Sequence, residues 1–215
     1  MTDNSPRSAA APVGVLLAGG QSRRMGGGDK GLLEIAGKTM LAHVIDRLAP
    51  QVARMVVNAN GDPARFAALG LPVVADTVGG FVGPLAGVLA GMRWTLAEAP
   101  RASHIVTVST DAPFLPADLV ARLAAALSAA PDMRIALAAS GGELHPVIGL
   151  WPVVLADDLE AALTQGLRKV LHWTDRHGSV AVDFPFVETR GRRLDPFFNA
   201  NTPEELAEAR LLIES

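Results

Sequence analysis

The sequence predicts an α/β protein with a three-layer, Rossmann-like fold, in which a mostly parallel central sheet carries helices on both faces. From Val13 onward, short β-rich apolar runs alternate with amphipathic stretches of helical period, as in parallel sheets. Several runs lack polar and apolar alternation, which indicates strands buried on both faces. Glycine and proline concentrate in residues 19–31, 78–87 and 140–146, and the first two segments follow strand-like runs, at the edge where open α/β sheets bind ligands.

Seven runs, each bounded by turn residues, are predicted to be strands: Val13–Ala18, Arg54–Asn58, Pro72–Ala75, Ile105–Ser109, Arg134–Ala139, His145–Leu150 and Val180–Phe184. Between them, two stretches place apolar residues at helical spacing, so each should cover the sheet with one face. The apolar faces are Leu41, Val44, Ile45 and Leu48 in the first stretch, and Leu119, Leu123, Ala126 and Leu127 in the second.

A last helix is predicted after Thr202, because the local sequence carries three helix-start signals. Thr202 suits the capping position, Pro203 the first helical position, and Glu205 follows the cap by three residues. Apolar residues then recur on one side, which predicts a helix packed on the body of the protein.

The composition predicts one globular domain, residues 13–215, preceded by a disordered tail, residues 1–12. With 215 residues, 49% hydrophobic and 19% charged, the chain is long enough for one sizeable core. The start has no apolar signal run, and no stretch approaches the ~20 apolar residues of a membrane span. The absence of cysteine excludes disulfides and thiolate catalysis and is compatible with a reducing cytosol. We therefore expect a cytoplasmic protein.

The charge balance argues against nucleic-acid and anionic-membrane partners. The formal net charge is −3, so the sequence offers no broad basic surface. Any phosphate-binding site must therefore be local.

The segment 17–31 has the composition of a phosphate-binding loop, with six glycines, two arginines and a lysine. Glycines let backbone N–H groups converge on phosphoryl oxygens, and the cations neutralise charge. It is neither a GxxxxGK[ST] loop, since Gly31 follows Lys30, nor a GxGxxG loop. A flexible, solvated loop is the alternative, but such linkers rarely follow a buried strand so abruptly.

This segment, LAGGQSRRMGGGDKGLLEIAGK, closely resembles the opening of the molybdenum cofactor guanylyltransferases, and the resemblance runs from about Val13 to about Leu206. It implies a Rossmann-like nucleotidyltransferase fold. It also implies that nucleotide contacts come from Leu17, Ala18, Gly19 and Lys30, while Arg24 and Gly20 match the motif as well.

Asp111 is the candidate magnesium ligand, because it lies just past an apolar strand. Mg²⁺ is typically held by one or two carboxylates with substrate phosphates and water. A helix cap or Asx turn before Pro113 is the alternative for an isolated aspartate. The resemblance favours the metal, since the family's aspartate at this position binds magnesium and triphosphate.

Asn58 and Asp76 end strand runs with side chains that can hydrogen bond a base or a ribose. A carboxylate suits guanine because it accepts from N1–H and the exocyclic amine, but which of the two residues reads the base stays open. Loop capping is the alternative for each. The family's nucleotide-binding positions match both, and its GPLAG segment matches residues 83–87, which we interpret as a substrate-side loop or an ordinary strand-to-helix turn.

The acceptor is expected to bind the second half of the chain. His145, Arg168 and Lys169 suit an anionic pterin phosphate, and the His-Pro pair and the Asn-x-Asn ending resemble the family. Asn199 or Asn201 would help to order the metal or the pterin. A turn-capping role is the alternative for His145. The other four histidines show no metal-ligand spacing such as HxxxH, which favours structural roles.

These observations lead to one hypothesis: GMP transfer from Mg–GTP to the phosphate of molybdenum-bearing molybdopterin, with release of pyrophosphate. Lys30 and Arg24 would offset triphosphate charge, and Asp111 would hold Mg²⁺. Molybdoenzymes or cofactor-delivery proteins would be transient partners. One rival is a molybdopterin cytidylyltransferase or another small-molecule nucleotidyltransferase, although the cytidylyltransferases tend to carry LAAG where this chain has Gly19. A non-catalytic nucleotide sensor is a second rival, disfavoured because Lys30 and Asp111 are both present.

Overall fold

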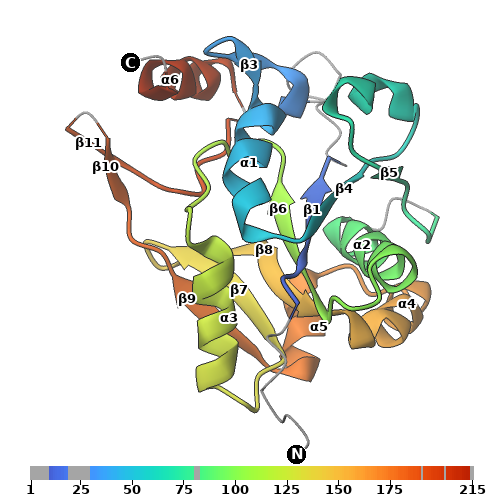
Figure 1. Cartoon of the computed structure of the whole chain (residues 1–215). Coiled ribbons are helices and arrows are strands. Elements are labelled where there is room, and N and C mark those ends of the chain that lie inside the picture. The colour runs from blue at the N-terminus through green and yellow to red at the C-terminus, as the bar shows by residue number, and fades with distance from the viewer. Residues whose placement is uncertain (1–9, 19–29, 80–82, 190, 201, 214–215) are drawn as a thin grey trace, which may run out of the picture.

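The computed structural model confirms a three-layer α/β fold around one seven-stranded sheet (Figure 1). It describes residues 10–18, 30–79, 83–189, 191–200 and 202–213. The strands lie in the order β5 (Val73–Val74), β4 (Arg54–Asn58), β1 (Val13–Leu17), β6 (His104–Ser109), β8 (Glu143–Pro152), β7 (Ile135–Ser140) and β9 (Ser179–Asp183).

The sheet is parallel except for β8, which runs antiparallel to both of its neighbours, β6 and β7. The other pairings, β1 with β4 and β6, β4 with β5, and β7 with β9, are all parallel. Six strands therefore end at one edge of the sheet, and β8 starts there. All seven predicted strands are present, with ends that differ from the predicted bounds by no more than two residues.

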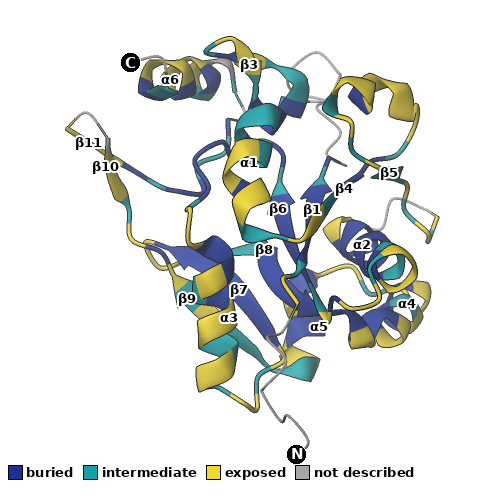
Figure 2. Ribbon diagram, in the orientation of Figure 1, coloured by how far each residue is buried: buried dark blue, intermediate teal, exposed yellow. Residues whose placement is uncertain are grey.

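Each face of the sheet is covered by helices that bury its side chains (Figure 2). One core joins α2 (Pro84–Glu98), α4 (Ala156–Thr164) and α5 (Val170–His177) to Val13 and Val15 of β1. The opposite core joins α1 (Met40–Leu48) and α3 (Leu119–Ala129) to Leu16. Since successive strand side chains point to opposite faces, a strand covered on both faces is apolar at nearly every position.

Capping hydrogen bonds stabilise two helix starts, of which the second, at Thr202, is predicted from the sequence. The Thr39 hydroxyl accepts from the Ala42 N–H at 3.1 Å at the start of α1. For α6 (Pro203–Ile213), the Thr202 N–H donates to the Glu205 carboxylate at 2.9 Å, and the Glu205 N–H donates to the Thr202 hydroxyl at 3.2 Å. This reciprocal pair is the capping box that the sequence predicts.

The shorter elements surround this framework. A hairpin of β2 (Glu34–Ile35) and β3 (Lys38–Thr39) lies against α6 in a small apolar cluster, and β10 (Val187–Thr189) pairs with β11 (Arg192–Leu194). Both hairpins are absent from the sequence prediction. Short 3-10 helices cover Lys30–Leu32, Ala49–Gln51, Pro63–Leu69 and Val153–Leu155. None of the helices in the described ranges is long and apolar enough to cross a membrane.

Candidate active site

The carboxyl edge of the sheet brings together the predicted nucleotide residues that the structure describes. Leu17, the last residue of β1, lies in register with Asn58 of β4 on one side and with Ser109 of β6 on the other. The Ala18 N–H donates to the Asn58 carbonyl at 2.9 Å, which ties the first residue past β1 to the end of β4. The predicted residues Gly19, Gly20, Arg24 and Asn201 lie outside the described residues.

Asn58 and Asp76 belong to one hydrogen-bond cluster that also contains Asn60. The buried Asn58 amide donates to Asp76 Oδ1 at 3.0 Å and to the Val74 carbonyl at 3.3 Å. Asn60 donates to Asp76 Oδ2 at 2.8 Å and accepts from the Asp76 N–H at 3.0 Å. Two amides therefore hold the carboxylate in one orientation, and its remaining lone pairs can accept from a ligand.

The first turn of α2 lies against this cluster, and Gly87 makes the close approach possible. A Cβ atom on Gly87 would lie 2.3 Å from Asn58 Oδ1 and 2.7 Å from Leu17 Cδ2. Gly87, the second glycine of the GPLAG segment, is thus required by packing, because any larger residue would displace the Asn58 side chain. Pro84 occupies the first helical position, as predicted.

Asp111 lies two residues past β6, and the C-terminal segment reaches it through the backbone. The Ser109 hydroxyl donates to Asp111 Oδ1, and the Asp111 backbone carbonyl accepts from the Ala200 N–H at 3.2 Å. Asn199, the neighbour of Ala200, has a buried Oδ1 with no hydrogen-bond partner in the part of the chain that the structure describes. A buried amide oxygen left unpaired costs stability, so this atom is a candidate to bind a cation or to accept a hydrogen bond from a substrate N–H group.

Lys30 starts its 3-10 turn beside the same region. The Leu33 N–H donates to the Lys30 carbonyl at 3.0 Å. The next residue, Gly31, is packed so closely that a Cβ there would lie 2.9 Å from Thr110 Cβ. The chain that carries Lys30 therefore touches the residue before Asp111, although about 80 residues separate them in sequence.

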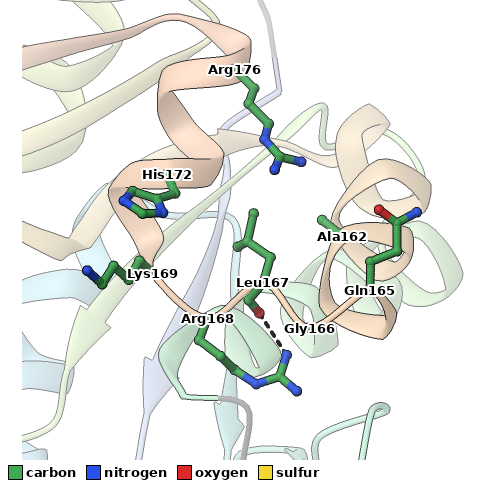
Figure 3. A pocket seen from close by; sticks show the side chains of 8 residues that line it. All are labelled: Ala162, Gln165, Gly166, Leu167, Arg168, Lys169, His172 and Arg176. Atoms are coloured by element: carbon green, nitrogen blue, oxygen red, sulfur yellow. Dashed lines mark hydrogen bonds between the residues drawn. The ribbon is translucent and has the colours of Figure 1, made fainter.

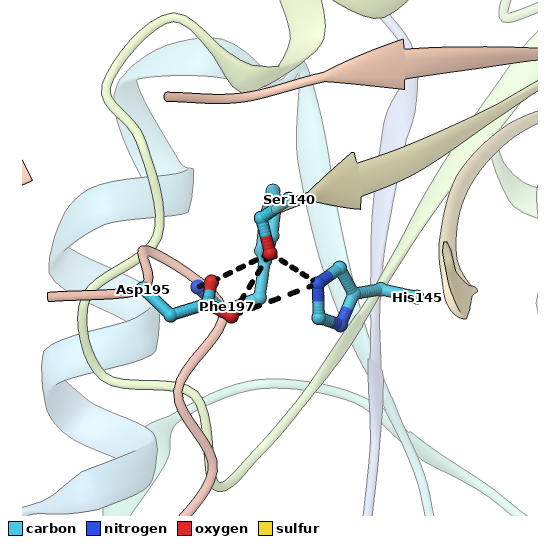
Figure 4. A network of polar contacts seen from close by, with 4 residues as sticks. All are labelled: Ser140, His145, Asp195 and Phe197. Atoms are coloured by element: carbon cyan, nitrogen blue, oxygen red, sulfur yellow. Dashed lines mark hydrogen bonds and ion pairs between the residues drawn. The ribbon is translucent and has the colours of Figure 1, made fainter. Parts of the chain in front are cut away.

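His145 takes part in a polar cluster at the same edge (Figure 4). Its Nε2 lies 2.6 Å from the Ser140 hydroxyl, which lies 2.8 and 2.9 Å from the two Asp195 carboxylate oxygens. The pairing of β7 with β8 slips next to His145, so residues 146–148 of β8 have no partner on β7. Burial lowers the pKa of His145, although the Asp195 and Glu143 carboxylates act in the opposite direction.

Arg168 and Lys169 line a basic hollow of about 430 Å³ between α4 and α5 (Figure 3). Arg168 donates to the Leu163 carbonyl at 2.9 Å and to the Leu167 carbonyl at 2.8 Å, so its guanidinium also satisfies the end of α4. His172 and Arg176 add further nitrogen atoms, and none of the acidic side chains that the structure describes lines the hollow. The arrangement fits an anionic group.

The described residues contain no group of three or more His, Cys, Asp or Glu side chains that could hold a metal ion by themselves. An ion beside Asp111 would therefore need oxygen atoms from amides, substrate and water, as Mg²⁺ accepts. Three other histidines have protein partners: His43 Nε2 lies 2.9 Å from the Ile35 carbonyl, His104 Nδ1 lies 2.9 Å from the Ser103 hydroxyl, and His177 Nε2 lies 2.7 Å from Asp158.

Three residues of these clusters were missed as site residues by the sequence analysis: Asn60, Ser140 and Asp195. Asn60 had a detectable signal, because it repeats an asparagine two residues past the end of a predicted strand. Ser140 and Asp195 are 55 positions apart, and neither stands in a motif that reveals their contact.

Comparison with known proteins gives a consistent result. The sequence profile of the MobA-like NTP transferase domain matches residues 14–182. The molybdenum cofactor guanylyltransferase of Bradyrhizobium sp. (strain ORS 278) is 58% identical over 209 residues, which cover 97% of this chain and 95% of the relative. That of Rhodopseudomonas palustris (strain BisB5) is 55% identical over 93% of this chain and 92% of the relative.

Solved structures share the fold. Molybdopterin-guanine dinucleotide biosynthesis protein A from Archaeoglobus fulgidus superimposes with a TM-score of 0.65 at 22% identity, covering 93% of this chain and 97% of that one. A CMP:2-keto-3-deoxy-manno-octonic acid synthetase complexed with CTP gives 0.67 at 14% identity, covering 95% and 98%. At these identities the likeness shows the nucleotidyltransferase fold alone.

Proposed function

The chain belongs to the MobA-like NTP transferase family and, within it, to the molybdenum cofactor guanylyltransferases, and from this premise we propose that it transfers GMP from GTP to molybdopterin. The enzyme is a nucleotidyltransferase. Its product is the guanine dinucleotide form of the molybdenum cofactor, and pyrophosphate leaves. The names of the relatives favour GTP over CTP as the substrate, so a cytidylyltransferase activity is disfavoured.

The observation that carries the proposal is the convergence of two acidic residues at one edge of the sheet, Asp76 in its amide cluster and Asp111 beside the C-terminal segment. We assign GTP contacts to Leu17, Ala18, Gly19, Gly20, Lys30, Asn58, Asp76 and Asp111. Asp76, oriented by two amides, matches the N1–H and exocyclic amine of guanine.

Nucleotidyltransferases that use GTP generally need a divalent metal, and we propose Mg²⁺ here. The donor set fits: Asp111 offers a carboxylate, and the unpaired Asn199 Oδ1 lies on the segment that contacts the Asp111 backbone. Asn201 is the alternative second ligand. Bound Mg²⁺ would polarise the α-phosphoryl group.

In the proposed step, an oxygen of the molybdopterin phosphate attacks the α-phosphorus of GTP in line. The new P–O bond joins GMP to the pterin phosphate, and the bond to the β-phosphate breaks, so no covalent enzyme intermediate is needed. Lys30 and Arg24 would offset the charge on the triphosphate, and catalysis would consist mainly of positioning and electrostatics.

The acceptor side is supported by the basic hollow. Arg168 and Lys169 would bind the phosphate of molybdenum-bearing molybdopterin, because within the described part of the chain the hollow gathers several nitrogen atoms and no acidic residue. His145 would contact the acceptor from the sheet edge. We place the reaction in the cytoplasm, with molybdoenzymes or cofactor-delivery proteins as recipients of the product.

The test is GMP transfer to molybdopterin with Mg²⁺, followed as pyrophosphate release from GTP or from CTP. We expect a clear preference for GTP, and Lys30→Ala to lower kcat by roughly 100-fold or more without unfolding the protein. Lys38→Ala is the matched control, because Lys38 pairs with Asp46 at 2.7 Å on the exposed β3 hairpin. A preference for CTP would refute the guanylyl assignment, and tight GTP binding without transfer would favour a sensor.

A further inference from the structure

The contacts among Ser140, His145 and Asp195 fix the positions of the polar hydrogen atoms that these side chains share. Ser140 has one hydroxyl hydrogen and lies within hydrogen-bond distance of both Asp195 oxygens and of His145 Nε2. A carboxylate can accept but cannot donate, so the hydroxyl hydrogen goes to Asp195. The contact with His145 then requires a hydrogen on Nε2, which donates to the Ser140 oxygen.

This arrangement differs from a nucleophilic triad. In a triad the carboxylate contacts the histidine, and the histidine accepts the serine proton. Here the carboxylate contacts the serine at 2.8 Å, and its nearest approach to His145 Nε2 is 4.0 Å. Ser140 is 1% exposed, so no substrate can reach its oxygen. The cluster orients His145 and does not generate a nucleophile.

The imidazole ring is also held from the side. The Phe197 ring packs on His145 with 4.7 Å between ring centroids and meets Phe184 edge-on at 5.2 Å. Asp195 Oδ1 accepts from the Phe197 N–H at 2.8 Å, so the same carboxylate holds both the serine and the packing ring. These contacts leave the imidazole with one orientation.

The second ring nitrogen, Nδ1, is directed away from Ser140 and Asp195 (Figure 4). It has no hydrogen-bond partner within the described residues, and it is not among their buried unpaired atoms. The side chain keeps 18% exposure, so Nδ1 can meet a ligand at the carboxyl edge. Burial also favours the neutral ring, because it lowers the pKa of His145.

We propose that Ser140 and Asp195 are positioning residues that hold His145 in its Nε2–H tautomer, so that Nδ1 accepts a hydrogen bond from a ring N–H of the pterin. The inference rests on the proposed function and refines the acceptor site. A lone pair on Nδ1 would repel a phosphate oxygen but match the amide and amine N–H groups of a pterin. Arg168 and Lys169, rather than His145, would then bind the phosphate of molybdopterin.

The tautomer is measured directly by nitrogen-15 NMR of histidine-labelled protein at pH 7.5, with His145→Gln to assign the signal. We expect a protonated Nε2 and an unprotonated Nδ1 in the unaltered chain. In Asp195→Asn, the new NH₂ group would donate to Ser140, whose hydroxyl would turn to His145 and favour the Nδ1–H tautomer. Ser140→Ala should give a mixture. Ser128→Ala, which alters an exposed serine of α3, is the matched control.

Binding is measured by anaerobic calorimetry with molybdopterin as the probe, and separately with Mg–GTP. Asp195→Asn and Ser140→Ala should each raise the Kd for molybdopterin about tenfold, and that for GTP less than twofold. An Nδ1–H or doubly protonated His145 in the unaltered chain overturns the proposal, as does a changed tautomer with unchanged molybdopterin affinity. If the unaltered chain fails to bind GTP while the tautomer results hold, the proposed function fails and the orienting role of the cluster stands.

Discussion

Gly87→Ala tests the close approach of α2 to the nucleotide cluster. The added Cβ would lie 2.3 Å from Asn58 Oδ1, well inside contact distance. Asn58 cannot yield easily, because it is 3% exposed and its amide is held by Asp76 and by the Val74 carbonyl. The substitution must therefore break this cluster or displace the start of α2.

The magnitude follows from opposing contributions. Overpacking costs about 1–3 kcal/mol, displacing a buried hydrogen-bonded amide adds about 1 kcal/mol, and replacing glycine inside a helix returns up to about 1 kcal/mol. The net loss should be about 2 kcal/mol, or a fall in Tm of roughly 4–8 °C for a chain of this size. GTP affinity should fall about tenfold, since Asp76 loses one of its two amides.

The assays are urea unfolding and calorimetric titration with Mg–GTP. Gly91→Ala is the control on the same helix, because its Cβ would lie 2.6 Å from Val15 Cγ2 in the apolar core. It should lower stability and leave GTP affinity within twofold. Asn58→Ala in the Gly87→Ala background should cost less than the sum of the two single changes, since it removes the clashing atom. Additive costs, or a Gly87→Ala protein with ordinary stability and GTP affinity, would refute the reasoning.

Further predictions concern the other clusters. Asn60→Ala should raise the Kd for GTP about fivefold, because Asp76 Oδ2 loses its amide, and a fall in kcat with an unchanged Kd would count against this role. In the unaltered protein, calorimetry should show tighter GTP binding with magnesium than with EDTA. Asp111→Asn should remove this difference. Lys169→Ala should raise the KM for molybdopterin about fivefold and leave the KM for GTP unchanged, and equal changes in both would contradict an acceptor role. Burial lowers the pKa of His104 in the folded protein. As the pH falls below about 6.5, this histidine is therefore protonated in the unfolded chain before it is protonated in the folded one, and the free energy of unfolding decreases. His104→Gln should flatten this loss in urea unfolding between pH 7 and 5, whereas an unchanged slope would exclude His104 as its source.

The fold was predictable from sequence because its signals are local or periodic. Apolar runs such as Arg54–Asn58 predict strands with the observed bounds, since a strand buried on both faces needs apolar side chains at nearly every position. The Thr202 capping box lies within four residues, so local hydrogen bonding alone determines it.

The site was only partly predictable. Asn58, Asp76 and Asp111 were predicted as site residues because they stand at or just past strand ends, and the structure brings their segments to one edge of the sheet. The antiparallel direction of β8 and the two small hairpins escaped prediction, because strand pairing depends on distant partners rather than on the composition of a run.

The sequence by itself therefore determined the fold class, the strands and the capped last helix, each through residues close together in the chain. The tertiary structure alone decided the partners of the site residues: Asn60 with Asp76, Ala200 with Asp111, and Ser140 with His145 and Asp195. The physical reason is that a hydrogen bond needs two groups within about 3 Å, and chain folding sets that distance for residues far apart in sequence.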